Sequence, residues 1–274
     1  MTIARVALVQ TRTPASQAAA LEHTAPLIEE AASGGAGLII TPEGSNFLQK
    51  ARPLFEETVT STEADPFVLG VRALARAHKT HILIGSALVR REDGKCANRS
   101  LLVDPTGDIV ATYDKIHMFD VDLPTGERHR ESNLYTPGEA AVVAPVAHGV
   151  LGLTICYDIR FPGLYRRLAS AGASILTVPS AFTRPTGKAH WETLLRARAI
   201  ENGAFVLAAA QGGTHEDGRA TWGHSMAIAP WGEVLAAFDG DEPGVLFADL
   251  NLDEVTKARA AIPSLLNGRE FSGP

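Results

Sequence analysis

The sequence predicts an α/β protein built as a four-layer α-β-β-α sandwich, with two sheets back to back and helices on each outer face. Short strands rich in Val, Ile and Leu alternate with helical segments, which is typical of α/β architecture. The same order of elements then occurs a second time, so each half is expected to form one sheet with helices on one face. The uncovered faces must be buried, and packing them against each other satisfies both sheets.

Local signals predict the elements of the first half. Apolar runs rich in β-branched residues indicate strands at residues 3–10, 38–41 and 81–90. We predict a helix at residues 17–32. Pro26 lies inside it and has no N–H to donate, so the helix should either be kinked there or begin late. Asp65 and Pro66 provide an N-cap and a first helical residue for another helix, which should end near His78.

Three segments of the first half match the second half in the same order, which indicates a pseudo-twofold repeat. Residues 32–42 match 169–179 at an offset of 137, Arg72 to Leu83 match Arg196 to Leu207 at 124, and the hairpin 100–111 matches 225–236 at 125. Pro-Thr-Gly and Pro-Trp-Gly supply the turns of the two hairpins. The alternative is two generic α/β units whose small-residue turns resemble each other.

Length and composition favour a globular protein with small-molecule or protein partners. With 274 residues and 45% hydrophobic content, the chain can bury a large core, as one domain over residues 1–274 or as two fused halves. A net charge of -6 provides no basic field for nucleic acid or acidic lipid. The apolar stretch after Arg5 is too short for a signal peptide, and none is long enough to span a membrane, so we expect a cytoplasmic protein.

The two cysteines have different surroundings. They form no Cys-x-x-Cys pair, so neither a disulfide framework nor a cysteine-rich zinc site is indicated. Cys96 lies in a polar stretch and is expected at the surface. Cys156 ends a predicted strand, 149–156, that runs into a turn and helix at 157–162. Backbone N–H groups and the helix dipole there favour a thiolate, and the Tyr157 N–H could bind an oxyanion; otherwise Cys156 is an ordinary buried residue.

A carboxylate that could serve a nucleophilic Cys156 follows the second strand. Glu43 comes just after the strand at 38–41, at the sheet edge where open α/β proteins bind ligands. Such a carboxylate can equally cap a turn or helix. Its counterpart in the internal repeat is Ser180, so the two halves have diverged here.

Two further charged residues lie between the halves. Lys115 ends a strand and could stabilise an oxyanion and lower the pKa of a neighbouring thiol; the alternative is a surface lysine paired with Asp114. Glu131 lies in the long loop 117–134, which is charged and would ordinarily be solvated surface. Long ordered loops are, however, often functional.

A cysteine–histidine pair is the alternative for a nucleophilic cysteine, with His117 and His190 as candidates. His190 is expected to open a helix, where packing or capping is its usual role. A glutamate and a lysine already supply the acid–base and oxyanion functions. No His-x-x-x-His pair or similar ligand spacing occurs, so the sequence indicates no metal.

Five motifs, in order along the chain, carry a resemblance to a known family. They are Pro42-Glu43, Asp114-Lys115-Ile116-His117, Cys156-Tyr157-Asp158-Ile159-Arg160-Phe161-Pro162, Pro179-Ser180-Ala181-Phe182-Thr183 and Gly187-Lys188-Ala189-His190-Trp191. Their order and spacing resemble the nitrilase (carbon–nitrogen hydrolase) superfamily over nearly the whole chain. The resemblance implies the nitrilase fold, which is the α-β-β-α sandwich, and a catalytic set of Glu43, Lys115 and Cys156 with Glu131 as a second glutamate. It implies no cofactor and no metal.

The implied catalytic set suits amide hydrolysis through a thioester. Cys156 would attack the carbonyl carbon, and Glu43 would act first as general base and then as acid. Lys115 and the Tyr157 N–H would hold the oxyanion, and Glu131 would orient Lys115 or the substrate. The family usually forms dimers through its helical faces, so a homodimer or larger homo-oligomer is expected.

Residues near the nucleophile bear on the substrate. Tyr157 stands where true nitrilases usually have tryptophan, so the resemblance favours amides over nitriles. Arg160 could clamp a substrate carboxylate in bidentate fashion or pair with Asp158. Phe182 and Thr183 follow a strand at the same sheet edge, where an aromatic wall and a hydroxyl donor would suit a short acyl group bearing a carboxylate.

Segments 181–191 and 208–212 are most similar to the branch that includes the deaminated-glutathione amidases, which release 2-oxoglutarate from Cys-Gly. Arg184 interrupts this match. The alternatives are an ω-amidase acting on 2-oxoglutaramate, an N-carbamoyl amino acid hydrolase, or a catalytically silent binding or scaffold relative, although no member of the catalytic set is missing. The C-terminal residues 262–274 lack a helical pattern and could form a tail that crosses to a partner.

Overall fold

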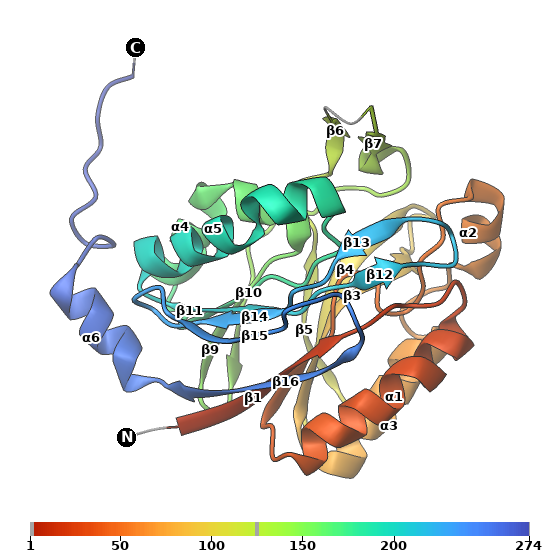
Figure 1. The fold of residues 1–274 in the computed structure, drawn as a ribbon, viewed down its shortest axis with the longest axis horizontal. Coiled ribbons are helices and arrows are strands. Elements are labelled where there is room, and N and C mark those ends of the chain that lie inside the picture. The colour runs from red at the N-terminus through yellow and green to blue at the C-terminus, as the bar shows by residue number, and fades with distance from the viewer. Residues whose placement is uncertain (1–2, 124–125, 274) are drawn as a thin grey trace.

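Two mixed six-stranded sheets form the centre of the computed structural model, which describes residues 3–123 and 126–273 (Figure 1). The first sheet has the strand order β16-β1-β2-β3-β4-β5. Its strands are β1 (Ile3–Gln10), β2 (Leu38–Ile40), β3 (His81–Arg90), β4 (Cys96–Val103), β5 (Ile109–Asp114) and β16 (Gly244–Asn251). Strands β1, β2 and β3 are parallel to one another, and the other three pair antiparallel.

The second sheet repeats this arrangement with the order β15-β14-β11-β10-β9-β8. Its strands are β8 (Val143–Val146), β9 (Gly149–Leu153), β10 (Ile175–Thr177), β11 (Phe205–Ala208), β14 (Met226–Ile228) and β15 (Val234–Ala237). Strands β9, β10 and β11 are parallel, and their outer neighbours are antiparallel. Two short hairpins, β6 (Asp120–Asp122) with β7 (Arg128–Arg130) and β12 (Gly212–Thr214) with β13 (Ala220–Trp222), lie outside these sheets.

Helices cover the outer face of each sheet, which completes the predicted four layers (Figure 1). The first sheet carries α1 (Gln17–Ser33) and α3 (Pro66–His78), and the second carries α4 (Pro162–Ser170) and α5 (Arg184–Asn202). The remaining helices are α2 (Arg52–Thr58), α6 (Asp253–Ala261) and the 3₁₀ turns η1 (Glu131–Asn133) and η2 (Cys156–Arg160). Among the described residues, no helix is long and apolar enough to cross a membrane.

The internal sequence matches coincide with equivalent strands, so the predicted repeat is confirmed. Strands β2 and β10 start at Leu38 and Ile175, β3 and β11 at His81 and Phe205, and β5 and β15 at Ile109 and Val234. These starts lie at the offsets of 137, 124 and 125 residues found in the sequence. The alternative of two unrelated α/β units is wrong.

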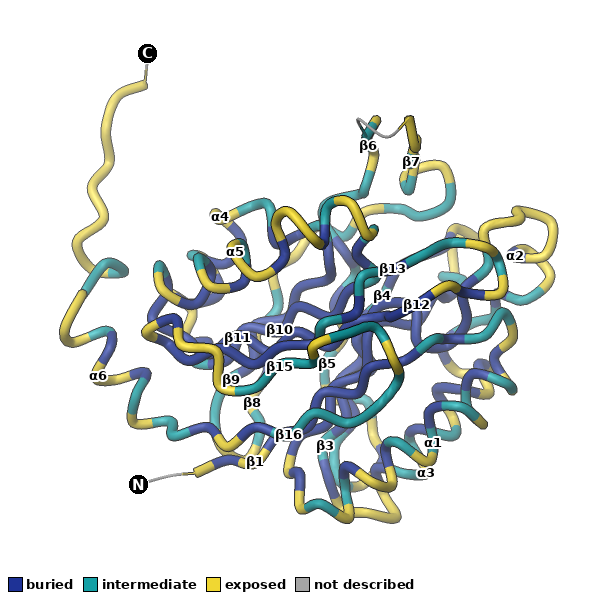
Figure 2. Tube along the Cα trace, in the orientation of Figure 1, coloured by how far each residue is buried: buried dark blue, intermediate teal, exposed yellow. Residues whose placement is uncertain are grey.

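The inner faces of the two sheets bury one apolar core, seen as the dark strands at the centre of Figure 2. Val6, Leu8 and Ile40 of the first sheet lie in the same buried cluster as Leu151 and Leu176 of the second. A separate cluster fills the space between the first sheet and its two helices. Burial of apolar area on this scale is the dominant favourable contribution to folding.

Gly85 brings the strand ends of the two sheets close together. A side chain at this position in β3 would overlap the Thr41 carbonyl oxygen and the Pro179 side chain. Thr41 follows β2 and Pro179 follows β10, so both polypeptide segments emerge beside each other at one edge of the sandwich. Glycine is required because two backbones approach here. The residues after these two strands, including Glu43, are thereby brought to one place.

Several local predictions are confirmed, and two differ in detail. The Asp65 carboxylate accepts hydrogen bonds from the backbone N–H groups of Phe67 and Val68, so it caps α3 as expected. Helix α1 begins at Gln17 and runs through Pro26, so the late start did not occur. Helix α5 begins at Arg184, so His190 lies within the helix and neither opens nor caps it.

Three expectations about exposure and loops were wrong. Cys96 is buried, with 5% of its surface exposed, because β4 begins there and places it in a small cluster with Phe55 and Tyr135. The predicted strand 149–156 ends at Leu153, because β9 stops pairing with its neighbouring strands before the η2 turn begins at Cys156. The loop 117–134 contains the β6–β7 hairpin, whose strands were not predicted from its charged sequence.

Candidate active site

The Cys156 thiol lies at a strained turn at the edge of the second sheet. Its backbone φ is 48°, in the left-handed region that non-glycine residues rarely adopt. The Cys156 N–H donates to the Pro179 carbonyl at 2.9 Å, which ties the turn to the end of β10. Only 7% of the residue is exposed.

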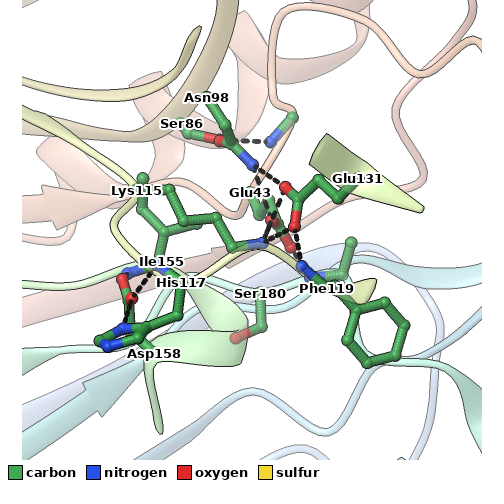
Figure 3. Close-up of polar contacts among 12 residues, drawn as sticks. Glu43, Ser86, Asn98, Lys115, His117, Phe119, Glu131, Ile155, Asp158 and Ser180 are labelled. Carbon is green, nitrogen blue, oxygen red and sulfur yellow. Dashed lines mark hydrogen bonds and ion pairs between the residues drawn. The ribbon is translucent and has the colours of Figure 1, made fainter. Parts of the chain in front are cut away.

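Asp158 holds this turn and was not identified from the sequence. Its carboxylate, which is fully buried, accepts hydrogen bonds from the Ile155 N–H at 2.9 Å, the Tyr113 hydroxyl at 2.7 Å and the His117 N–H at 3.1 Å. Tyr113 and His117 flank Lys115 in the chain, so one carboxylate connects the lysine segment to the cysteine turn. Figure 3 shows Asp158 between Ile155 and His117. Its position two residues after the cysteine was the available signal.

Lys115 lies between the two predicted glutamates. Its ammonium is 2.8 Å from Glu43 Oε1 and 2.8 Å from Glu131 Oε2, and its side chain is 2% exposed (Figure 3). Lys115 follows β5, Glu43 follows β2 and Glu131 opens η1, so three separate segments supply the cluster. The alternative of a surface lysine paired with Asp114 is wrong, because Asp114 pairs with Arg99 at 2.6 Å.

Backbone and side-chain donors fix both carboxylates. The other oxygen of Glu43 accepts from the Ala181 N–H at 2.8 Å, and Glu131 accepts from the Phe119 N–H at 2.6 Å. Asn98, which the sequence reasoning missed, donates from Nδ2 to Glu43 at 2.9 Å and to Glu131 at 3.1 Å. An asparagine inside a strand carries no local signal of such a role.

The protonation states follow from burial and neighbouring charge. Burial opposes ionisation of Glu43, but the charge of Lys115 and hydrogen bonds from Lys115, Cys156 and Asn98 outweigh it and lower the pKa of the carboxyl group. Burial likewise disfavours the ammonium of Lys115, yet Glu131 and Glu43 raise its pKa well above the usual value. Glu43 is therefore an anion and Lys115 a cation near neutral pH.

The thiol of Cys156 rests protonated, contrary to the expectation of a stabilised thiolate. Burial and the adjacent Glu43 carboxylate raise its pKa well above the usual value, and they outweigh the opposing charge of Lys115. The mutual influence on the two pKa values places the thiol beside the Glu43 carboxylate. A carboxylate in contact with a neutral thiol is placed to accept its proton when the sulfur attacks.

The candidate histidines bind elsewhere. His117 Nδ1 is 2.7 Å from the Asp158 carboxylate, and its ring stacks on Phe161 at 3.6 Å between centroids. His190 Nδ1 is 3.1 Å from a guanidinium nitrogen of Arg160. In the described part of the chain neither candidate histidine hydrogen-bonds to Cys156, whereas the Glu43 carboxylate lies close enough to raise the pKa of the thiol, which argues against a cysteine–histidine pair.

The four residues predicted to contact substrate make contacts with different neighbours. The Tyr157 ring packs edge-on against Phe119, with centroids 5.1 Å apart. Phe182 is 6% exposed, and the Arg160 guanidinium lies over its ring, 5.8 Å from the centroid. The Thr183 hydroxyl pairs with that of Thr186 at 2.8 Å, next to the start of α5.

The two arginines considered for substrate binding, Arg160 and Arg184, have different partners. Arg160 forms no salt bridge with a carboxylate in the described part of the chain, so the proposed pairing with Asp158 does not occur. Arg184 is bound to Asp241 at 2.7 Å. Of the two, Arg160 keeps its charge available for an acidic ligand.

The profile of the Carbon-nitrogen hydrolase family matches residues 5–260. The chain belongs to this family. Its members among the curated proteins include the deaminated glutathione amidase of Synechocystis sp., which is 42% identical over 252 residues covering 89% of this chain and 90% of the relative. This chain is therefore a carbon–nitrogen hydrolase and an amidase of the nitrilase superfamily.

Solved structures of other carbon–nitrogen hydrolases share the fold. The C. elegans NitFhit protein superposes with a TM-score of 0.90 at 33% identity; the match covers 97% of this chain and 65% of the NitFhit chain. An amidase from Nesterenkonia sp. superposes with a TM-score of 0.78 at 28% identity, covering 95% and 98% of the two chains. That structure is of a glutamate-to-glutamine mutant and shows acrylamide added to the active-site cysteine.

Proposed function

We propose that Cys156 is the nucleophile of this amidase, with Glu43 as general base and acid, Lys115 as the oxyanion cation and Glu131 as the group that orients Lys115. The observation that carries the proposal is the buried cluster in which one ammonium lies between two carboxylates while the first carboxylate contacts a neutral thiol. A buried ionised cluster of this kind is costly to assemble, and such perturbed groups concentrate at functional sites.

The acylation step uses the resting protonation states directly. Cys156 Sγ attacks the amide carbonyl carbon as its proton moves to Glu43, so the carbonyl oxygen becomes an oxyanion. The ammonium of Lys115 and the Tyr157 N–H stabilise that oxygen, and removing one such donor typically costs roughly 10²- to 10³-fold in rate. The tetrahedral species collapses when Glu43 returns the proton to the leaving nitrogen. The amine departs, and a thioester remains on Cys156.

In the hydrolysis of the thioester, water takes the place of the thiol as nucleophile and the Cys156 sulfur is the leaving group. The Glu43 carboxylate removes a proton from water as its oxygen attacks the thioester carbonyl carbon, and the same two donors hold the second oxyanion. Collapse expels the Cys156 sulfur, which takes the proton back from Glu43. The products are a carboxylic acid and the original thiol, so the residues return to their starting states without a cofactor.

We propose deaminated glutathione as the substrate, with attack at the amide that joins its 2-oxoglutaryl half to Cys-Gly. The named activity of the Synechocystis relative supports this assignment. So does Arg160, whose guanidinium lies over Phe182 and lacks an acidic partner among the described residues, because it can receive a carboxylate in bidentate fashion.

The test compares kcat/KM for three classes of amide with the purified protein. We expect 2-oxoglutarate to be released faster from deaminated glutathione than from 2-oxoglutaramate, and N-carbamoyl amino acids to be turned over slowest. A preference for 2-oxoglutaramate would indicate an ω-amidase instead, and a preference for the carbamoyl compounds would contradict the assignment altogether. Replacing Arg160 by Met should raise KM for the acidic substrates more than it lowers kcat.

We also propose that the protein is a homodimer in the cytoplasm and that residues 1–274 form one domain with a C-terminal tail. Both cysteines are free thiols, as is usual in a reducing compartment. Leu266 and Phe271 on the tail are 85% and 90% exposed, and the tail extends away from the body in Figures 1 and 2. Large apolar side chains exposed to this degree favour burial against a partner.

Light scattering of the full chain and of a chain ending at Ile262 tests the dimer. We expect a dimer for the full chain and weaker association, with lower thermal stability, after truncation. A truncated protein that stayed dimeric with unchanged stability would show that the tail does not hold the partner.

A further inference from the structure

Asn98 closes a ring of hydrogen bonds around the two glutamates. Its Nδ2 and the Lys115 ammonium both donate to Glu43 Oε1, at 2.9 and 2.8 Å, and both donate to Glu131 Oε1, at 3.1 and 2.9 Å. Figure 3 shows the amide and the ammonium on either side of the carboxylates. Asn98 lies on β4 directly beside the lysine, since its carbonyl accepts the Lys115 N–H at 2.9 Å.

The orientation of this amide is forced by its neighbours. Both carboxylates accept hydrogen bonds only, so the amide nitrogen must face them, and the reversed amide would place Oδ1 against two anions. Oδ1 then points to a buried position where it has no hydrogen-bond partner within the described residues. Leaving a polar atom buried and unpaired is unfavourable, so the two donated hydrogen bonds must offset that cost.

We propose that Asn98 is a positioning residue of the amidase reaction, which holds the carboxylates of Glu43 and Glu131 in place beside the ammonium of Lys115. The inference rests on the catalytic roles proposed above for the cluster. It assigns to Asn98 no contact with the substrate. Its effect passes through Glu43, the base that receives the thiol proton.

Charge balance explains why a neutral donor is needed. Glu43 faces the ammonium of Lys115, the thiol of Cys156, the carboxylate of Glu131 and, further away, the phenol of Tyr135. One cation thus serves two carboxylates, and a second negative charge nearby disfavours the ionised form of the buried Glu43. The hydrogen bonds from Asn98 stabilise both anions without adding charge, and they contribute to the lowered pKa of Glu43.

The pH dependence of kcat/KM for the amide substrate tests the proposal. Asn98→Leu has similar volume but no donor, so the pKa of Glu43 should rise and the acidic limb of the profile should move up by about one pH unit. Ser100→Ala is the matched control, because it removes a buried hydrogen bond to the Gly85 carbonyl from the same strand without touching a glutamate. Its acidic limb should stay at the wild-type position.

Asn98→Asp, which keeps the shape of the side chain, tests the same point if the leucine variant does not fold. The added negative charge should move the acidic limb further than leucine does. An unmoved limb in a folded Asn98 variant would overturn the proposal, as would failure of both variants to fold while Ser100→Ala folds, since Asn98 would then be only structural.

Alkylation of Cys156 by iodoacetamide, followed peptide by peptide with mass spectrometry, gives a readout that needs no substrate. In Asn98→Leu the pH at which Cys156 becomes reactive should shift downward, because a Glu43 carboxylate with a raised pKa accepts the thiol proton more readily. In Asn98→Asp it should shift upward, because the added negative charge disfavours the thiolate. An absence of amidase turnover in the wild-type protein would contradict the proposed function, whereas an unshifted alkylation profile would contradict the role of Asn98 alone.

Discussion

The internal repeat gives the candidate active site a counterpart at equivalent positions of the other half, and the two sites, which we call corners, differ in charge. The charged corner consists of Cys156, Glu43 and Lys115. At the offsets of 137 and 125 residues, Glu43 corresponds to Ser180 and Lys115 to Gly240. Thr11 corresponds to Cys156. In the first half β1 pairs with β2 through Val6 and Leu38, and in the second half β9 pairs with β10 through the equivalent residues Leu151 and Ile175, so Thr11 and Cys156 both lie five residues after the paired residue of their strand. We call Thr11, Ser180 and Gly240 the neutral corner.

The polar groups of the neutral corner are held by hydrogen bonds between uncharged groups, one of which reaches the charged corner, since Gln211 Nε2 also donates to the Glu43 carbonyl at 3.0 Å. The Thr11 hydroxyl donates to Gln211 Oε1 at 3.0 Å, and Gln211 Nε2 donates to Thr13 at 2.7 Å. The Gly240 carbonyl accepts from Gln10 Nε2 at 2.9 Å. None of these groups is charged, and Thr11 lacks the positive φ found at Cys156. The same fold therefore supports either a reactive or an inert corner, and the side chains decide which.

Cys156→Ala should have the largest effect on the charged corner. Turnover should fall by about 10⁴-fold or more, since no acyl intermediate can form. The protein should remain folded, because one small side chain is lost at a strained position. Amide turnover and circular dichroism on the same preparation decide the matter. Retained amidase activity would contradict the assignment of the nucleophile.

Lys115→Met should destabilise the charged corner more than any change to the neutral one. It leaves the buried Glu43 and the partly buried Glu131 without their cation, and removing one partner of a buried pair typically costs about 3–5 kcal/mol. Glu43 has a lowered pKa in the folded protein, so its contribution is present at neutral pH and lost as the pH falls. The difference in unfolding free energy between variant and wild type should therefore shrink in acid. A difference independent of pH would contradict this account.

Glu43→Gln should separate thiol reactivity from turnover. Loss of the general base should lower kcat by about 10²- to 10⁴-fold. The pKa of Cys156 should fall at the same time, because the carboxylate that raises it is gone while Lys115 still lowers it. Iodoacetamide should then alkylate Cys156 faster at neutral pH than in the wild type. Slower alkylation would show that Glu43 does not hold the thiol in its neutral form.

Much of this comparison could be predicted from the sequence, and the remainder depended on pairing between distant segments. Glu43, Lys115 and Cys156 each lie at a strand end, which made them candidates, and the resemblance to the nitrilase superfamily selected them as a set. The repeat identified Ser180 as the counterpart of Glu43. Asn98 gave no such signal, because its hydrogen bonds to the two glutamates depend on β4 lying beside the lysine.

Two further features could not be predicted from the sequence, because they also depend on contacts between distant segments. The neutral thiol follows from how closely burial brings Glu43 to Cys156, which no motif specifies. Asp158 binds Tyr113, which lies 45 residues earlier in the chain. The sequence alone shows which residue types lie at strand ends. Protonation states, and contacts between segments far apart in the chain, can be determined only from the packed structure.

Thr11→Val should have the smallest effect on turnover and should test whether the neutral corner is inert. Valine has the shape of threonine but cannot bond Gln211 or Thr13, so unfolding should become easier by about 1–2 kcal/mol. Thr24→Val is the matched control, since the Thr24 hydroxyl is buried without a hydrogen-bond partner in the described structure and its loss should cost nothing. Both variants should keep wild-type kcat. A large fall in kcat for Thr11→Val alone would mean that the reaction uses both corners, and the division between them would be wrong.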